Sequence, residues 1–358
     1  MLTNRTYSAI SLFSGAGGMD VGFKKASILP RLANDIDPDA CESYRQNHPE
    51  HPILQGDIKG YFADLKKHKG TDFVFGGPPC QGFSVAGKMN PADVRNELLM
   101  VYTDIVGLIS PKIFVCENVK ALAMLEKWHS IRSSFLGRMR KNYTVGMLVL
   151  NSRDYGVPQN RERVFFVGIH KDLLDIPTLP WEQSFVKELA FFKKAPLSIR
   201  EVVEELGPAG SKSNKRTCRA KITFAKAPIL RRSPYAGMLF NGAGRPLPSE
   251  GQSSTLPASM GGNKTPIIDE GVIFSQQDSF VEGYHTYLMR GGKPHKGEAP
   301  TQLRRMTVDE CLAIQTFPSK YHLHGKQSSM YRQVGNAVPP LFAYAVAQSA
   351  VNLLEQSE

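Results

Sequence analysis

The sequence predicts an α/β protein with a doubly wound, mainly parallel sheet and a smaller, irregular second lobe. In the first half of the chain, short apolar runs rich in β-branched residues alternate with helix-like segments, which is the pattern of such a sheet. After His170 the chain becomes rich in Gly, Pro, Ser, Lys and Arg, which is typical of irregular structure. The length of 358 residues also exceeds that of one average domain.

The expected elements follow in order along the chain. Strand-like runs occupy residues 7–13, 31–36, 72–75 and 112–116, and helix-like patterns occupy 38–47 and 96–109. Residues 143–150 and 164–169 look like an antiparallel pair that closes the sheet. In a doubly wound sheet, ligands bind at the carboxyl ends of the strands.

Beyond residue 170, a sustained helical pattern is expected only at about 197–206 and near the end of the chain. A helix near 306–315 should begin with Thr307 as N-cap and Glu310 three residues later, the spacing of a capping box. Residues 340–354 form an amphipathic helical pattern. We therefore expect a sheet domain at 1–170, an irregular domain at 171–303, and a C-terminal segment, 304–358, that returns to the sheet domain.

The positive charge of the chain is concentrated in its second half. The formal net charge is +11, and residues 206–249 contain no acidic residue. The nine cations of this stretch are Lys212, Lys215, Arg216, Arg219, Lys221, Lys226, Arg231, Arg232 and Arg245. A solvated basic loop is one explanation, and a polyanionic partner such as nucleic acid is the other.

The cysteines and the apolar runs exclude several classes of protein. The five cysteines are scattered without Cys-x-x-Cys spacing, which argues for a reduced compartment and against structural zinc. No run approaches the roughly 18 uncharged apolar residues of a membrane span. The first residues lack the apolar stretch of a secretory signal. We expect a cytoplasmic protein that holds no metal and contacts no membrane.

A glycine-rich turn follows the first expected strand, at residues 13–18. It departs from the dinucleotide fingerprint Gly-x-Gly-x-x-Gly because position 20 is Asp, which disfavours a nicotinamide or flavin cofactor. Asp35 (or Asp37) and Asp57 follow later strands and could accept hydrogen bonds from a ribose and an adenine. These groups suit a nucleoside without a pyrophosphate, such as S-adenosylmethionine.

Cys80 follows another strand, in the run Gly77-Pro78-Pro79-Cys80-Gln81-Gly82-Phe83-Ser84. A lone cysteine is more often a small buried apolar residue, but prolines that constrain the loop favour a fixed nucleophile here. Glu117 and Asn118 end the next expected strand and should lie at the same edge of the sheet. The run Gln159-Asn160-Arg161-Glu162-Arg163 could supply the cations that a thiolate requires.

The chain resembles the DNA (cytosine-5) methyltransferase family of bacterial restriction-modification systems, because six of the family's motifs occur in the usual order. They are Phe13 to Gly17, Pro79-Cys80-Gln81, Glu117-Asn118-Val119, Gln159 to Arg163, Arg304-Arg305-Met306-Thr307 through Gln315-x-Phe317-Pro318, and Gln333 to Val338. The resemblance implies the sheet of S-adenosylmethionine-dependent methyltransferases and the transfer of a methyl group to carbon 5 of a cytosine flipped out of duplex DNA. It also implies that the thiolate of Cys80 adds to carbon 6, that Glu117 contacts ring nitrogen 3, and that Arg163 steadies the exocyclic oxygen, with Arg161 as a further candidate for active-site support or for the target phosphate.

The same resemblance assigns the cofactor site and the DNA contacts. The cofactor residues are Phe13, Gly15, Ala16, Gly17, Asp35, Ile36, Asp57, Ile58, Leu98 and Asn336. The family usually has Glu at the position of Asp35 and often an aromatic residue at that of Ile36. Gln81, Ser84 and Lys88 belong to a mobile loop, at about 81–97, that closes over the base.

The irregular domain corresponds to the family's target-recognition region. We expect Arg231 and Arg232 to contact phosphates, and Arg245, Asn263 and Lys264, on two exposed loops, to contact base edges. The alternative is that these loops contact phosphate alone. The target sequence cannot be derived, although a short GC-rich palindrome is our guess.

The expected partner is double-stranded DNA, the expected state is a monomer, and a cognate restriction endonuclease could accompany the protein. Three alternatives remain. A tRNA cytosine-5 methyltransferase is disfavoured by the long recognition region. A catalytically silent DNA-binding regulator is disfavoured by the intact Cys80, Glu117 and Arg163, and a nicotinamide oxidoreductase by Asp20.

Overall fold

The computed structural model describes residues 5–79, 97–174 and 181–357 and divides the chain into two compact units. The first unit comprises Met1–Tyr155, Arg161–Lys194 and Val338–Glu358, and the second comprises Gly156–Asn160 and Ala195–Ala337. These divisions differ from the predicted boundaries, because the chain leaves the sheet unit at residue 195 and re-enters it at residue 338.

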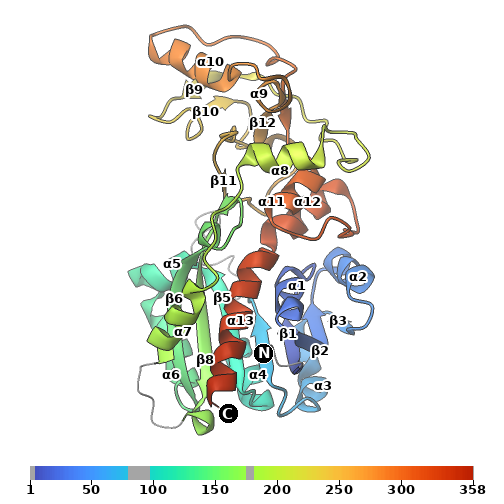
Figure 1. Ribbon diagram of the computed structural model, residues 1–358, viewed down its shortest axis with the longest axis vertical. Helices are drawn as coiled ribbons and strands as arrows, with labels where there is room; N and C mark the ends of the chain where they lie inside the picture. The colour runs from blue at the N-terminus through green and yellow to red at the C-terminus, as the bar shows by residue number, and fades with distance from the viewer. Residues whose placement is uncertain (1–4, 80–96, 175–180, 358) are drawn as a thin grey trace. The chain divides into compact units, whose positions relative to one another are not determined.

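The first unit contains a seven-stranded sheet in the order β3-β2-β1-β4-β5-β8-β6 (Figure 1). Its strands are β1 (Tyr7–Leu12), β2 (Ile28–Asp35), β3 (Ile53–Gln55), β4 (Phe73–Gly76), β5 (Ile113–Val119), β6 (Tyr143–Asn151) and β8 (Glu162–His170). The first five run parallel, and β8 is antiparallel to both β5 and β6. The predicted doubly wound sheet and its closing antiparallel pair are therefore confirmed, and the strand order reverses beside β1.

Helices cover both faces of this sheet. The helices of the unit are α1 (Gly18–Lys25), α2 (Pro38–Asn47), α3 (Phe62–Lys66), α4 (Glu97–Ile109), α5 (Lys120–Met124), α6 (His129–Met139), α7 (Trp181–Ala190) and α13 (Pro340–Ser357), and the short 3-10 turns are η1 (Ile58–Tyr61), η3 (Glu126–Trp128), η4 (Ser152–Asp154) and η5 (Lys171–Leu173). On one face, α4 and α6 pack on the sheet around Tyr102, Phe114 and Phe135. Elsewhere, α13 lies along α1 and α7, and Phe342 contacts Phe165 of β8.

Glu117 and Asn118 lie near the end of β5, as predicted, and pair with Phe165 and Val164 of β8. Two other details of the first unit correct the sequence predictions. α7 lies in a stretch that we expected to be irregular, and its Trp181 indole donates to the carbonyl of Val167 at 3.1 Å. β2 begins three residues earlier than predicted, at Ile28.

The second unit has short elements and a small apolar core. Its strands are β7 (Gln159–Asn160), β9 (Phe224–Ile229), β10 (Met238–Phe240), β11 (Ser253–Ser254), β12 (Ile267–Asp269) and β13 (Leu303–Arg305), and its helices are α8 (Ile199–Leu206), α9 (Glu270–Ser275), α10 (Phe280–Met289), α11 (Val308–Ile314) and α12 (Gln327–Asn336), with the turn η6 (Gly262–Lys264). Phe240 and Tyr284 belong to its hydrophobic cluster. The helix α10 was not predicted, because only its buried face, with Val281, Tyr284 and Leu288, carries the apolar pattern.

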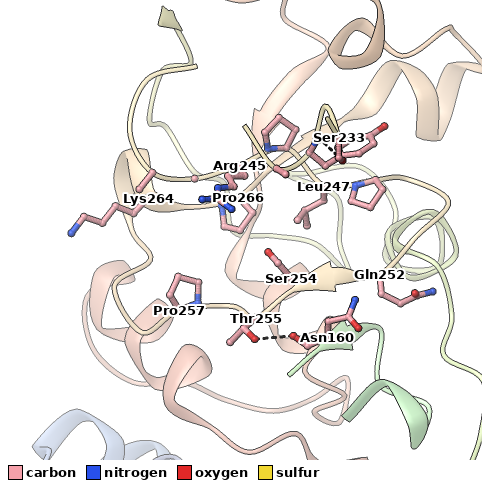
Figure 2. Close-up of a pocket in the computed structure, with 16 residues that line it drawn as sticks. Asn160, Ser233, Arg245, Leu247, Gln252, Ser254, Thr255, Pro257, Lys264 and Pro266 are labelled. Atoms are coloured by element: carbon pink, nitrogen blue, oxygen red, sulfur yellow. Dashed lines mark hydrogen bonds between the residues drawn. The ribbon is translucent and has the colours of Figure 1, made fainter. Parts of the chain in front are cut away.

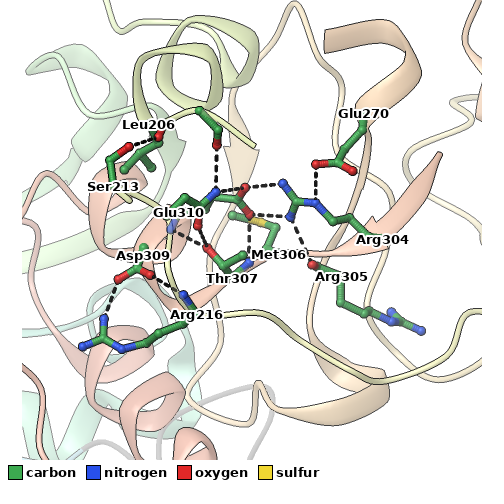
Figure 3. Close-up of polar contacts among 12 residues, drawn as sticks. Leu206, Ser213, Arg216, Glu270, Arg304, Arg305, Met306, Thr307, Asp309 and Glu310 are labelled. Atoms are coloured by element: carbon green, nitrogen blue, oxygen red, sulfur yellow. Dashed lines mark hydrogen bonds and ion pairs between the residues drawn. The ribbon is translucent and has the colours of Figure 1, made fainter. Parts of the chain in front are cut away.

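The segment between residues 304 and 337 belongs to the second unit, which corrects its predicted return to the sheet. β13 pairs with β12, and α11 packs against α8 and α12. Figure 3 shows the polar contacts that hold this region, in which Arg304 bridges Glu270 and Glu310. The predicted capping box is present, since Thr307 accepts from the Glu310 N–H at 3.0 Å and the Glu310 carboxylate accepts from the Thr307 N–H at 2.8 Å.

One helical stretch, Gln327–Ser357, is long and apolar enough to meet the composition test for a membrane span. However, 72% of its apolar window is buried inside the protein, as in the core helices of globular domains.

Candidate active site

The glycine-rich turn lies at the carboxyl end of β1 and leads directly into α1. Phe13 has a positive φ of 54°, which few aromatic residues adopt, and it turns the chain sharply after the strand. Gly17, with φ 87°, is the N-cap of α1. A Cβ added at Gly15 would meet no atom of the described chain within 4 Å, so the turn borders open space. Ala16 is buried beneath it.

Asp35 lies at the end of the neighbouring strand β2 and contacts this turn. One oxygen of its carboxylate accepts from the Gly15 N–H at 2.8 Å, and the other accepts from the Asp37 N–H at 2.8 Å. Burial raises the pKa of Asp35 above its ordinary value, against the lowering effect of these N–H donors. Each carboxylate oxygen has a second lone pair, so the group can still accept bonds from ribose hydroxyls.

The remaining cofactor candidates divide into three groups. Ile36 is 68% exposed beside Asp35, and Asp57 is exposed after β3, where its carboxylate also accepts from the Lys59 N–H at 3.0 Å. The side chains of Ile58 and Leu98 pack in or against the hydrophobic core. Asn336 ends α12 in the second unit, and its cofactor contact stays a prediction.

The described groups at this edge fit S-adenosylmethionine. The open space at Gly15, the exposed apolar surface of Ile36 and the carboxylates of Asp35 and Asp57 lie at the ends of three adjacent strands. Within residues 5–79, 97–174 and 181–357, no group of three metal-ligating side chains occurs, and the prediction of a metal-free site stays a prediction.

A glutamate–arginine pair lies across the next strands of the same edge. Val119 of β5 pairs with Arg163 of β8, so the start of the antiparallel strand reaches the carboxyl end of the parallel one. The Arg163 Nε contacts the Glu117 Oε1 at 2.9 Å, and both side chains are only about one-eighth exposed, at 13% and 12%. The register of the sheet therefore brings together two of the four predicted catalytic residues.

Gly77 allows this carboxylate to lie against the loop that leads to Cys80. A Cβ at Gly77 would come within 2.8 Å of the Glu117 Oε2. Asn118 also holds this loop, since its Nδ2 donates to the carbonyl of Pro78 at 3.3 Å. No role was predicted for Asn118, although its place in the Glu-Asn-Val motif was a signal. Cys80, Gln81, Ser84 and Lys88 lie outside the described residues.

Arg161 is buried, with a side chain almost inaccessible to solvent. Its backbone is held by Asn151, whose Oδ1 accepts from the Arg161 N–H at 3.2 Å, and by Ser152, whose N–H donates to the Arg161 carbonyl at 3.0 Å. A buried guanidinium supports neighbouring structure, so burial favours active-site support over contact with a target phosphate.

The second unit contains a cleft of about 670 Å³ (Figure 2). Arg245 and Lys264 line it. Asn263 is not among its described lining residues, and its carbonyl accepts from the Gly244 N–H at 3.1 Å. In Figure 2 the Lys264 side chain extends away from the centre of the cleft. Four polar side chains of the lining were not predicted as site residues or quoted in a motif, and they are Ser233, Tyr235, Gln252 and Ser254.

Arg305 joins the two loops that border this cleft. Its Nη1 donates to the carbonyls of Thr265 at 2.8 Å and Gly244 at 3.2 Å, and its Nη2 donates to the carbonyl of Asn241 at 2.8 Å. Burial lowers the pKa of Arg305 to about 10. A Cβ at Gly244 would meet the Thr265 carbonyl at 1.9 Å, so only glycine permits this approach.

The basic stretch 206–249 is partly neutralised by carboxylates from elsewhere in the unit. Arg216 pairs with Asp309 at 2.5 Å and Lys221 with Glu298 at 2.5 Å. Arg231 and Arg232 are exposed and form no ion pair in the described part of the chain. They are therefore the better candidates for phosphate contacts.

The groups that could hold a nucleoside lie where the strand order reverses, and the turn beside them lacks the fingerprint of a pyrophosphate site. These features are typical of the α/β methyltransferases that use S-adenosylmethionine. Within that class the chain belongs to the C-5 cytosine-specific DNA methylase family, which matches residues 7–352. The family transfers a methyl group from S-adenosylmethionine to carbon 5 of cytosine in DNA, and the chain is a DNA cytosine-5 methyltransferase by this membership.

Individual relatives agree with this assignment. The chain is 32% identical to the type II methyltransferase M.Eco47II of Escherichia coli over 99% of its own length and 81% of that protein. It is 31% identical to M.NgoPII of Neisseria gonorrhoeae over 97% and 96% of the two chains. The crystal structure of the S. pombe Dnmt2 methyltransferase, at 17% identity, covers 98% of both chains with a TM-score of 0.66 and shows a common fold.

Proposed function

We propose that Cys80, Glu117 and Arg163 methylate one cytosine of a specific site in double-stranded DNA, and that the second unit selects the site. The observation that carries this proposal is the Glu117–Arg163 pair at 2.9 Å, held against Gly77 three residues before Cys80. The relatives named type II methyltransferases support duplex DNA as the substrate.

The residues divide the chemistry as follows. The base is flipped out of the stack, since carbon 6 cannot be reached inside the duplex. The thiolate of Cys80 adds to carbon 6, and the electron pair of the broken double bond makes carbon 5 nucleophilic. Bound S-adenosylmethionine supplies the methyl group and becomes S-adenosylhomocysteine. Glu117 holds and protonates ring nitrogen 3, Arg163 stabilises Glu117 and the exocyclic oxygen, and loss of the carbon 5 proton expels the thiolate.

The environment of the site favours this division. Glu117 and Arg163 are mostly removed from solvent, so their mutual orientation is fixed before the base arrives. Phe13, Gly15, Asp35 and Ile36 would hold the cofactor at the adjoining strand ends.

The test uses purified protein, labelled S-adenosylmethionine and both duplex DNA and tRNA. Label should enter DNA, Cys80→Ser should abolish transfer, and Cys218→Ser, which changes a partly buried cysteine of the second unit, should leave it unchanged. Duplexes containing 5-fluorocytosine should trap a covalent adduct on Cys80. Label on tRNA alone, or an adduct on another cysteine, would contradict the proposal.

The biological setting is also a proposal, and the relatives named type II methyltransferases support it. We infer a monomer that acts in the cytoplasm, with a cognate restriction endonuclease that cleaves the same site when it is unmethylated. Sequencing DNA from a host that expresses this chain for 5-methylcytosine would report the activity and its target together.

A further inference from the structure

Asp20 is a fully buried carboxyl group directly behind the cofactor turn. It lies in the first turn of α1, and its Oδ1 accepts from the hydroxyl of Tyr44 in α2 at 2.9 Å. Its Oδ2 and the nearby hydroxyl of Ser11 in β1 are also buried, and this hydroxyl lowers the pKa of the carboxyl group. A fully buried carboxyl group is costly in free energy, so Asp20 calls for an explanation.

The Asp20–Tyr44 hydrogen bond connects the two segments that form the cofactor site. α1 continues the glycine turn, since the Val21 N–H donates to the Gly17 carbonyl at 3.0 Å. α2 begins three residues after Asp35, at Pro38, and contacts it, because the Cys41 thiol donates to the Asp35 carbonyl at 3.4 Å.

The turn and Asp35 are thus joined at two places. At the ligand side the Gly15 N–H donates to the Asp35 carboxylate, and behind the turn Tyr44 donates to Asp20. The second connection fixes the direction in which α1, and hence the turn, leaves the sheet.

We propose that Asp20 is a positioning residue for the cofactor, which through Tyr44 fixes the spacing between the glycine turn and Asp35. The proposal rests on the proposed cofactor site and adds to it a residue that does not touch the ligand.

The charge state of Asp20 gives the proposal a second, independent readout. Burial, with a smaller contribution from the Asp35 carboxylate, raises the pKa of Asp20 to about 7, although the hydroxyls of Ser11 and Tyr44 lower it. Asp20 is therefore neutral below about pH 7, and above it a charge appears in a buried site that faces Asp35. The ring of His48 lies 4.6 Å from that of Tyr44, and Phe75 of β4 stacks on Phe23 of α1.

The sign of the pH effect follows from these neighbours. Ionised Asp20 repels Asp35 and loses solvation, so the turn is held less firmly and cofactor affinity falls as the pH rises through about 7. S-adenosylhomocysteine is the appropriate probe, because it lacks the sulfonium charge that an ionised carboxylate would attract.

The experiment measures binding of S-adenosylhomocysteine by calorimetry between pH 6 and 8.5, together with kcat and KM for S-adenosylmethionine. Tyr44→Phe removes the hydrogen bond and should weaken binding about three- to tenfold, with kcat at saturation within about twofold of the original. Asp20→Asn keeps an oxygen acceptor for Tyr44 without a charge, so its affinity should match that of the unmodified protein at pH 6 and stay flat to pH 8.5.

Tyr143→Phe is the matched control, because it removes another buried tyrosine bond in the same unit, to the Pro111 carbonyl at 2.9 Å. Equal affinity in Tyr44→Phe and Tyr143→Phe, or an Asp20→Asn protein that keeps the pH dependence of the unmodified chain, would overturn the proposal. An unmodified protein that binds no S-adenosylhomocysteine would overturn the proposed cofactor site as well, so the two failures are distinguishable.

Discussion

The two units of this molecule position their functional groups by different means. In the first unit, strand register places the groups, as when Val119 opposite Arg163 brings Glu117 against Arg163. In the second unit, a buried side chain does so, because Arg305 holds the loops around the cleft through their backbone carbonyls. Register follows from a periodic pattern in the sequence, whereas the contacts of a single buried arginine do not.

The two arrangements also differ in how much one substitution should destabilise them. The whole sheet holds each strand end in position, so a change in one side chain leaves the neighbouring residues in place. A loop held by one guanidinium loses its position when that group is removed, since several carbonyls lose their donor together. Substitutions in the first unit should therefore change chemistry, and those at Arg305 should change folding and site selection.

The largest expected effect is on catalysis, in Glu117→Gln. We expect kcat to fall about 10²- to 10⁴-fold, the usual contribution of a positioned general acid, because the amide cannot donate a proton to ring nitrogen 3 in the same way. KM for S-adenosylmethionine should change little, since Glu117 lies at the ends of β4 and β5 and not beside Asp35. Single-turnover methylation of duplex DNA measures the change.

A matched substitution on the same edge sharpens this result. Lys120→Gln removes a neighbouring ion pair, to Glu162 at 2.7 Å, that is exposed to solvent. It should leave kcat within about twofold, because exposed pairs contribute little. Equal losses in both variants would mean that the edge as a whole, and not the Glu117 carboxylate, supports the reaction.

The second effect is on stability, in Arg305→Met. It removes the donors to Asn241, Gly244 and Thr265 while keeping a side chain of similar length. We expect the free energy of unfolding to fall by about 3 kcal/mol or more, since each buried carbonyl left without a donor costs about 1–3 kcal/mol. Urea denaturation followed by probes in each unit measures this loss, which should appear in the transition of the second unit.

Arg245→Met is the control for this prediction, because Arg245 follows Gly244 in one of the loops that Arg305 holds, and its side chain is exposed. It should shift stability by no more than about 0.5 kcal/mol. If Arg305→Met were equally mild, the loops would be held by other contacts and the comparison between the units would fail.

The same distinction explains what the sequence could predict. The sheet, α2, the capping box of α11 and the course of α13 followed from periodicity, cap residues and glycine turns, all of which are local signals. Glu117 was predicted to lie beside Cys80 because strand ends in a doubly wound sheet meet at one edge, whereas the role of Arg163 came from the family resemblance.

The structure of the second unit could not be predicted in the same way, because its contacts join residues far apart in the chain. Gln159 was predicted only as the first residue of the motif that ends at Arg163, but its amide donates to Gln315 at 3.1 Å and its oxygen accepts from the Leu256 N–H at 3.2 Å. Asn214 likewise bonds Glu310 and Thr307, nearly a hundred residues away. No local sequence pattern predicts such pairings. For this reason residues 304–337 were expected to return to the sheet domain, whereas they belong to the second unit.

The third effect is on site selection, in Arg245→Ala and Lys264→Ala. If these side chains contact base edges, each substitution should relax discrimination at one position of the target by about 1–3 kcal/mol. Methylation of a library of duplexes, read by sequencing, measures the preference at every position. A uniform loss across all sequences would instead show contacts with phosphate alone.

The smallest effect is expected in Arg231→Ala and Arg232→Ala, which are exposed in the basic stretch of the second unit. Each should weaken binding to all duplexes alike and reduce the slope of log affinity against log salt by about 0.9, because one fewer phosphate is neutralised. Arg140→Ala, at the end of α6 in the first unit, removes the same charge from an exposed position and serves as the control. A slope reduced equally in all three variants would trace the effect to net charge. A slope reduced only in the first two would locate the DNA backbone along this stretch and leave base discrimination to the cleft that Arg305 holds in place.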